Sequence, residues 1–287
     1  MPDCIKRNVV TPSGRRIVYY YYPQQDSDFT LLLLHGFAEH AFIWLPSVAE
    51  ITRLFNCDII VPDLSGHGLS DWRKDGRYTI DGYAEDIEII LTRSNVDHLI
   101  LAGHSMGGSI IEHIALRHLN SIQGIIFVDY CPISGISATR NDIVKNFKTS
   151  VVRTWAPMDY VRFIQSTRPL IPEALVPWFV SHLLVERNGQ FFVHADPRIA
   201  EYSKSDGLML KNDCCHVLNH HIPVFIIRGE YSSIVKEEDA KCFLSGFFSS
   251  CCFSVPNAGH GLIVENNVIF NRIFCNVLYN INQTASI

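Results

Sequence analysis

Short apolar runs alternate with amphipathic stretches along most of the chain. Seven of these runs predict strands, at residues 16–22, 30–34, 58–62, 98–102, 124–128, 224–227 and 251–255. Several are apolar at nearly every position, as in Thr30–Leu34 and Gly124–Val128. Continuous apolar runs of this length are typical of strands that are buried on both faces, as in a parallel sheet.

The stretches between the runs have helical periodicity. Helices are predicted at residues 79–92, 106–119, 236–244 and 268–279. In the first of them, Tyr83, Ile87 and Ile90 share one face, and Thr79 or Asp81 is suited to cap its start. Strand–helix alternation predicts an α/β protein with a doubly wound, mostly parallel sheet. Ligand sites in such sheets lie at the carboxyl ends of the strands.

One segment, from residue 132 to about residue 206, interrupts this alternation. It has no clear buried strand, it is rich in aromatic residues, and four prolines divide it into short helices. A loop of this length without structure of its own is uncommon in a compact protein. We therefore expect an α/β core formed by residues 1–131 and 207–287, with residues 132–206 inserted as a helical cap.

Composition and charge narrow the class of protein. Apolar residues make up 47% of the 287 positions, which is ample for a packed core, and charged residues only 18%. The chain has 24 basic and 29 acidic residues. Its basic residues do not form clusters larger than pairs such as Lys6–Arg7 and Arg15–Arg16. A nucleic-acid partner is therefore not expected. The sequence does not predict an oligomeric state.

The lengths of the apolar runs and the number of cysteines favour a location in the cytoplasm. No apolar run is long enough to span a bilayer, and the first residues lack the apolar stretch of a signal peptide. The nine cysteines are odd in number and include adjacent pairs, so they do not suggest a disulfide framework. We expect a cytoplasmic protein with free thiols and no membrane span.

The chemistry begins at Gly103-His104-Ser105-Met106-Gly107, which matches the pattern G-x-S-x-G. The motif follows a predicted strand and opens a predicted helix, which is the context in which the serine of this pattern acts as a nucleophile. A sharp turn there lifts the Ser105 hydroxyl clear of the sheet, and glycines two residues before and after it avoid collisions with the crossing chain. The alternative is a glycine-rich turn with an inert serine.

A serine hydroxyl needs a base to take its proton. Among the 13 histidines, His260 is the best placed, because it follows the last predicted strand in Pro256-Asn257-Ala258-Gly259-His260-Gly261. Its small neighbours leave the ring free to reach across the strand ends. The alternative is a histidine of a surface loop.

These motifs resemble those of the α/β-hydrolase fold enzymes that carry a helical cap. The resemblance rests on His35-Gly36-Phe37, on Pro62-Asp63-Leu64-Ser65-Gly66-His67-Gly68, on the Ser105 motif and on Gly259-His260, in the order of the family. It implies a catalytic serine, acid and histidine in that chain order. It also implies that the backbone N–H groups of Phe37 and Met106 form an oxyanion hole.

The acid is the point where the sequence departs from the family pattern. Family members most often carry it after the next-to-last strand, in a stretch like G-x-x-D, but here Ser232 stands at that position. Other members take the acid from the end of the preceding strand, where this chain has Asp129. Asp129 is therefore the predicted acid, with Glu230 as the alternative.

The resemblance implies a serine hydrolase that acts on a small or medium apolar carboxylic ester, thioester or lactone without a cofactor. An acyltransferase or lyase, a carbon–carbon bond hydrolase that uses the same site, and a non-catalytic ligand receptor remain alternatives. A cluster of Cys214, Cys215, His216, His220 and His221 lacks the paired spacing of zinc sites, so no metal site is predicted.

Overall fold

The computed structural model describes residues 3–94, 96, 98–117, 121–134, 139–202 and 222–284. Within them, eight strands form one sheet in the order β1-β2-β4-β3-β5-β6-β9-β10. The strands are β1 (Ile5–Val10), β2 (Arg16–Tyr22), β3 (Phe29–Leu34), β4 (Cys57–Pro62), β5 (Leu99–His104), β6 (Ile122–Val128), β9 (Val224–Gly229) and β10 (Ser250–Val255). From β4 to β10 all neighbours are parallel, whereas β2 is antiparallel to both β1 and β4.

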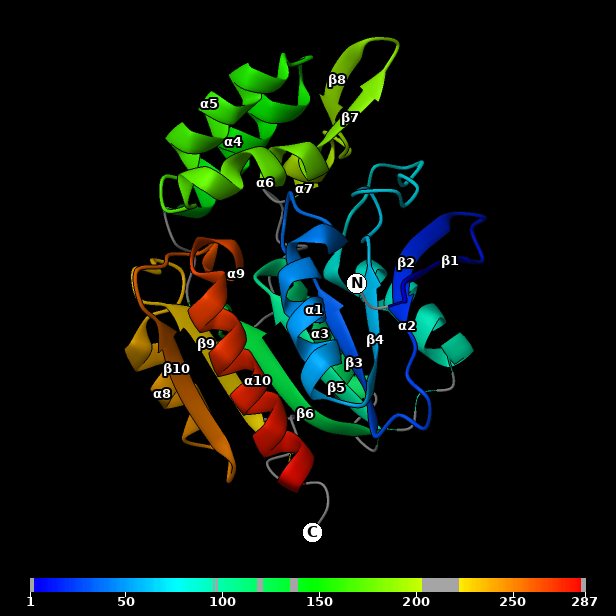
Figure 1. The fold of residues 1–287 in the computed structure, drawn as a ribbon. Helices are drawn as coiled ribbons and strands as arrows, with labels where there is room; N and C mark the ends of the chain where they lie inside the picture. The colour runs from blue at the N-terminus through cyan, green and yellow to red at the C-terminus, as the bar shows by residue number, and fades with distance from the viewer. Residues whose placement is uncertain are drawn as a thin grey trace.

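Helices cover both faces of this sheet (Figure 1). Apolar side chains of α1 (Leu45–Leu54) and α10 (Asn267–Thr284) join one core cluster. Those of α2 (Ile80–Ser94), α3 (Met106–Arg117) and α8 (Glu237–Leu244) join the other.

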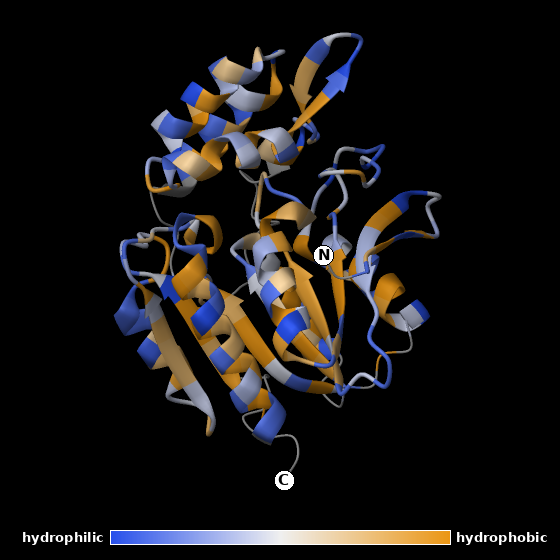
Figure 2. Cartoon of the chain, in the orientation of Figure 1, coloured by the Kyte–Doolittle hydropathy of each residue, from blue (hydrophilic) through white to orange (hydrophobic). Residues whose placement is uncertain are grey.

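The strands contribute alternately to the two clusters, because successive side chains of a strand point to opposite faces. In β3, Leu31 and Leu33 belong to one cluster, and Leu32 and Leu34 to the other. Figure 2 shows the consequence as a largely hydrophobic central sheet between helices of mixed hydropathy. The prediction of strands buried on both faces is confirmed.

Every strand predicted from the apolar runs is present, with ends shifted by two residues at most. The four predicted helices are present too, and Thr79 caps α2 by accepting the N–H of Gly82 (3.1 Å). The sequence analysis missed β1, which is an exposed edge strand with a mixed pattern, and α1, where only Ser47, Val48 and Ile51 are buried.

An inserted segment, residues 139–202, lies beyond the carboxyl ends of the parallel strands; we call it the insert (Figure 1). It contains α4 (Thr139–Val151), α5 (Pro157–Thr167), the short 3₁₀ helix η2 (Glu173–Leu175), α6 (Val176–Leu183) and α7 (Ile199–Tyr202). Pro157 and Pro177 lie in the first turns of α5 and α6, where a missing N–H costs nothing. The division into core and cap at residues 132 and 206 stays a prediction, and residue 206 lies outside the described residues.

The insert also contains two strands that the sequence analysis did not predict. Strands β7 (Leu184–Arg187) and β8 (Gln190–Val193) form an antiparallel hairpin. Its turn is Asn188-Gly189, both with positive φ (53° and 77°), as a two-residue hairpin turn requires. The strands are short and only partly buried, so no apolar run reveals them, and the Asn-Gly pair was their one signal.

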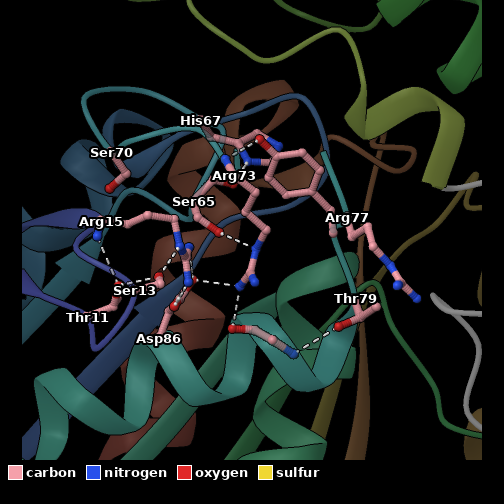
Figure 3. A network of polar contacts seen from close by, with 12 residues as sticks. Thr11, Ser13, Arg15, Ser65, His67, Ser70, Arg73, Arg77, Thr79 and Asp86 are labelled. Atoms are coloured by element: carbon pink, nitrogen blue, oxygen red, sulfur yellow. Dashed lines mark hydrogen bonds and ion pairs between the residues drawn. The ribbon is translucent and has the colours of Figure 1, made fainter. Parts of the chain in front are cut away.

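Polar contacts hold the long loop between β4 and α2 against the core (Figure 3). Arg15 donates to both carboxylate oxygens of Asp86 (2.8 and 3.0 Å), and Arg73 donates to one of them (2.8 Å). Arg73 also donates to the carbonyl of Gly82 and the hydroxyl of Ser65. Two guanidinium groups therefore share a buried carboxylate and fix the loop to α2.

The same loop anchors the end of the insert. The Tyr78 hydroxyl donates to the buried carboxylate of Asp196 (2.6 Å), whose own N–H donates to the carbonyl of Gly66 (2.8 Å). The N–H of Gly68 donates to the carbonyl of His194 (3.1 Å). These contacts keep the insert over the strand ends, where the chemically active motifs also lie.

Candidate active site

Ser105 lies in the turn that joins β5 to α3. Its φ is 52°, in the left-handed region that residues other than glycine rarely adopt, at a cost of about 1–2 kcal/mol. Its N–H donates to the carbonyl of Val128 at the end of β6 (2.9 Å), which holds the turn in place. The side chain is partly exposed and lines a cavity.

The glycines around Ser105 allow this turn because the chain crosses itself closely. A Cβ at Gly103 would lie 2.3 Å from the carbonyl oxygen of Gly107, and one at Gly107 would lie 2.6 Å from that of Leu34. Both contacts involve backbone, which cannot move aside cheaply. The two glycines of the motif are therefore required by the strand–turn–helix geometry itself.

His260 follows β10, in the loop that leads to α9 (Leu262–Glu265). Its Nδ1–H donates to the Oδ2 atom of Asp129 (2.7 Å). That bond fixes the tautomer and leaves Nε2 as an acceptor for the hydroxyl of Ser105, whose Oγ is 2.9 Å away. The side chain of His260 is 20% exposed, and that of Asp129 is fully buried.

Asp129 directly follows β6, with a φ of 45°. Its N–H donates to the carbonyl of Ile227, and its Oδ1 accepts the N–H of Gly229 (3.0 Å), both in β9. The neighbouring strand thus holds the carboxylate toward His260. The structure brings Ser105, His260 and Asp129 together in one chain of hydrogen bonds.

Ser232, at the position where the family pattern has its acid, also contacts this carboxylate. Its hydroxyl donates to Oδ2 of Asp129 (2.7 Å). The same oxygen of Ser232 accepts the N–H groups of Ile234 and Val235 (3.2 and 3.1 Å), so its proton is directed at the carboxylate. Asp129 therefore accepts three hydrogen bonds, from His260, Ser232 and Gly229.

Glu230, the alternative acid, is exposed and turned to another partner. Its carboxylate accepts the N–H of Asn257 (2.9 Å). The carboxylate that contacts the ring of His260 is that of Asp129.

Phe37 and Met106, predicted to supply oxyanion-hole N–H groups, belong to two chain segments that approach each other at Ser105. Met106 is the first residue of α3, where backbone N–H groups lack partners within the helix. Phe37 lines the same cavity as Ser105, and a Cβ at the preceding Gly36 would lie 3.2 Å from the Cβ of Ser105. The two chain segments therefore meet at the serine.

The cavity beside Ser105 and His260 has a volume of about 290 Å³. The insert supplies its apolar wall, which includes Phe147, Tyr160, Phe163, Ile164, Leu183 and Val193. Burial raises the pKa of Tyr160 to about 12, so its hydroxyl stays neutral. The cavity thus has an apolar wall on the insert and polar groups on the sheet side.

Glu39 and His104 form one pair of ionisable groups on that polar side. His104 Nδ1 and Glu39 Oε2 are 2.9 Å apart, and both side chains are more than nine-tenths buried. Arg168, which follows α5 in the insert, donates to the other carboxylate oxygen of Glu39 (3.2 Å). Burial opposes both charges, but the pair outweighs it: the pKa of His104 is raised and that of Glu39 is lowered.

Asp63 and His67, which lie in the family motif after β4, make structural contacts. Asp63 accepts the N–H groups of Ala41 and Leu69 (2.9 and 2.8 Å), and burial raises its pKa to about 6. His67 donates to the carbonyl of Ser65, and burial lowers its pKa to about 4.

Among the described residues, no group of histidine, cysteine or acidic side chains is arranged to hold a metal ion. The cluster of Cys214, Cys215, His216, His220 and His221 lies outside these residues. No helix in the described part of the chain is long and apolar enough to cross a membrane.

Glu39 and Arg168 were not predicted from the sequence, and His104 was given no function. Ser232 was noticed, but its hydrogen bond to Asp129 was not predicted. A signal existed for Glu39, an acidic residue in a mostly apolar stretch shortly after a strand. None existed for Arg168, which reaches the site only through the fold of the insert.

Comparison with known proteins places the chain in a family. Residues 30–267 match the family model of the alpha/beta hydrolase fold. The chain is similar to the lipase LipV of Mycobacterium tuberculosis, with 28% identity over 99 residues. That match covers 34% of this chain and 36% of LipV, so the chain spans about a third of the length of this curated relative.

Two other similarities extend over most of the chain. The AB hydrolase superfamily protein YisY of Bacillus subtilis is 23% identical, with 85% of this chain and 89% of YisY covered. The crystal structure of E-2-(acetamidomethylene)succinate hydrolase superposes with a TM-score of 0.80 at 19% identity, covering 96% of this chain and 99% of that chain. At this identity the structural likeness concerns the fold.

Proposed function

The chain belongs to the α/β hydrolase fold family, and from that premise we propose that it is a serine hydrolase. Its substrates are small to medium apolar carboxylic esters, thioesters or lactones, cleaved through an acyl-enzyme on Ser105. The observation that carries the proposal is the unbroken chain of hydrogen bonds from Ser105 through His260 to Asp129, with distances of 2.9 and 2.7 Å.

In the first step, His260 Nε2 takes the proton of the Ser105 hydroxyl while Oγ attacks the acyl carbon. The N–H groups of Phe37 and Met106 stabilise the oxyanion, and each such donor is worth roughly 3 kcal/mol in the transition state. Asp129 stabilises the imidazolium of His260 and keeps its orientation. His260 then gives the proton to the leaving alcohol or thiol, or to the ring oxygen of an opened lactone.

In the second step, water completes the cycle. His260 takes a proton from a water molecule whose oxygen attacks the acyl carbon. The tetrahedral intermediate collapses, the carboxylic acid leaves, and the proton returns to the Ser105 oxygen. In this proposal, groups of the protein supply the nucleophile, the base, the acid and the oxyanion hole.

The cavity supports the substrate class. Aromatic and aliphatic side chains from α4, α5, α6 and β8 form its apolar wall, and its volume of about 290 Å³ suits a compact acyl group. In this proposal the insert acts as a cap that covers the acyl group and excludes water from it.

A series of p-nitrophenyl esters with acyl chains of increasing length tests the proposal. We expect hydrolysis with an optimum at short to medium chains, and loss of hydrolysis in Ser105→Ala, because the nucleophile is removed. The same rate in Ser105→Ala and the unaltered protein would refute the proposal. So would a complete lack of hydrolysis by the unaltered protein across the series.

A further inference from the structure

We propose that Glu39 and His104 are positioning residues for the reaction: Glu39 keeps His104 as an imidazolium, and His104 in turn holds the loop that carries the base His260. The inference rests on the proposed function, because it assigns a role to two groups that touch the site without taking part in bond making.

Both ring nitrogens of His104 face oxygen atoms that can only accept. Nδ1 lies 2.9 Å from the carboxylate of Glu39, and Nε2 lies 2.8 Å from the backbone carbonyl of His260. A neutral imidazole has one N–H, so it can make only one of these bonds. Both bonds are made only by the imidazolium, which donates from each nitrogen.

A second buried histidine nearby shows the opposite state. His35 donates from Nδ1 to the carbonyl of Gly36 (2.8 Å), and its Nε2 accepts the N–H of Leu64 (3.0 Å). One donor and one acceptor fit the neutral ring. The contrast shows that burial alone does not decide the charge of a histidine here, and that the partners of His104 select the imidazolium.

Glu39 connects four parts of the site. One carboxylate oxygen accepts the N–H of Gly36 (3.2 Å), in the segment that leads to Phe37, and the bond from His104, the neighbour of the nucleophile. The other accepts the bond from Arg168 of the insert (3.2 Å). Through His104, the same carboxylate reaches the backbone of His260.

The geometry at His260 makes this connection matter for catalysis. The ring centroids of His104 and His260 are 4.9 Å apart. The bond from His104 fixes the backbone carbonyl of His260, and the ring of His260 bridges Ser105 and Asp129. A shift of the His260 backbone would lengthen both bonds of its ring. Displacements of about 1 Å in such a site cost on the order of 10²-fold in rate.

The charges around His104 determine how its two hydrogen bonds, to Glu39 and to the carbonyl of His260, depend on pH. Glu39, from the turn after β3, and Asp129, from the end of β6, both favour its protonated form, and burial opposes it. Further ionisable groups are His260 on the loop after β10, Glu265 of α9 and Arg168 of the insert, and all three line the cavity. The net result is a raised pKa of His104, so one of its two bonds is lost only as the pH rises through that value.

Two variants test the inference. Glu39→Gln keeps the shape of the side chain and removes its charge, and His104→Gln removes the titrating ring. In Glu39→Gln we expect kcat to fall on the order of 10²-fold with little change in KM, since the base rather than the acyl pocket is disturbed. We also expect the alkaline limb of the kcat profile to move to lower pH, because the carboxylate that favours the imidazolium is gone. In His104→Gln this limb should disappear.

A nitrogen-resolved NMR titration of the histidine rings, assigned with His104→Gln, follows the proton directly. At about pH 7 we expect both nitrogens of His104 to be protonated in the unaltered protein and one of them in Glu39→Gln. Glu112→Gln is the matched control, because Glu112 is also a buried glutamate but accepts from the Tyr130 hydroxyl (2.6 Å). It should leave kcat, its alkaline limb and the His104 signals unchanged.

The outcomes separate this inference from the proposed function. An active protein whose Glu39→Gln variant is folded and keeps kcat and its pH profile overturns the inference alone. A neutral His104 ring in the unaltered protein at about pH 7 does the same. A protein that hydrolyses no ester and does not react at Ser105 with an active-site phosphonate refutes the proposed function, and the inference with it.

Discussion

Ser232 stands where the family pattern has its acid, and Asp129 is the carboxylate that contacts His260 in this chain. The residue after β9 that is expected to be the acid is a serine, and its hydroxyl donates to the carboxylate that follows β6. The imidazole of His260 thus donates to a carboxylate that follows β6, the strand next to β9. At the residue scale, the proposed role of His260 as the base therefore depends on which carboxylate supports its ring.

Replacing Asp129 by asparagine should lower kcat by about 10⁴-fold, because the amide favours the wrong tautomer of His260 and cannot stabilise its cation. Glu230→Gln is the matched control and should change kcat little, since Glu230 is exposed and contacts Asn257. Steady-state kinetics of both variants check this. Reversed effects of the two variants would mean that Glu230 is the acid.

Replacing Ser232 by alanine should weaken the support of Asp129 without removing it. A hydrogen bond to a charged group contributes about 1.5–3 kcal/mol, so kcat should fall roughly 10-fold to 100-fold, far less than in Asp129→Asn. Ser245→Ala, which removes an exposed hydroxyl at the end of α8, serves as the control. Unchanged kinetics in Ser232→Ala would show that its bond to Asp129 contributes nothing to the reaction.

At the scale of elements, the central feature is the crossing of β5, the Ser105 turn and α3. Gly103 and Gly107 lie where β5 and α3 approach each other and the end of β3. The turn therefore depends on the absence of two side chains, and a methyl group at either position would push the serine away from its place.

Gly107→Ala tests this requirement. Its Cβ would lie 2.6 Å from the carbonyl oxygen of Leu34, so we expect a loss of about 1–3 kcal/mol in the free energy of unfolding together with loss of esterase activity. Gly189→Ala, in the hairpin turn, meets no atom within 4 Å and strains only its φ of 77°. That control should lose stability and keep activity. Full activity in Gly107→Ala would contradict the steric argument.

The elements of the core could be predicted from the sequence because local pattern determines them. Fully buried strands appear as apolar runs, and the serine motif appears as a strand, two glycines and a helix. The β7–β8 hairpin was missed because its strands are short and half-buried, so that only Asn188-Gly189 marks it.

The contact between Glu39 and His104 could not be predicted in this way. The two residues are 65 positions apart and meet because β3 and β5 are neighbours, with Leu34 opposite Gly103. The order of strands in a sheet is a property of the whole fold. The motifs and the resemblance to a family predicted Ser105, Asp129 and His260 as site residues, but they gave no indication of the charges beside them.

At the scale of the whole molecule, the buried charges give stability a dependence on pH. Burial raises the pKa of Glu112 from 4.5 to about 7, so between these values the folded protein binds more protons than the unfolded chain. Stability from this group is present at low pH and is lost as the pH rises to about 7. The shift corresponds to ~3 kcal/mol.

Glu112→Gln should remove this dependence, because the amide does not titrate. Urea denaturation at about pH 5 and about pH 8 should show that the stability of the variant relative to the unaltered protein increases with pH, by ~3 kcal/mol. Asp63, whose raised pKa of about 6 acts in the same direction, is common to both proteins and cancels. If the two proteins differ in free energy of unfolding by the same amount at both pH values, the claim that Glu112 is a buried carboxyl with a raised pKa is contradicted.

The most direct test of the account is covalent labelling with a fluorophosphonate, because such a reagent reacts with a serine only when a base activates it. We predict rapid incorporation of one phosphonyl group, mapped by peptide mass spectrometry to Ser105. Labelling should be abolished in Ser105→Ala and strongly slowed in His260→Ala. A protein that stays unlabelled while correctly folded, or that is labelled at another residue, would contradict the claim that Ser105 is an activated nucleophile.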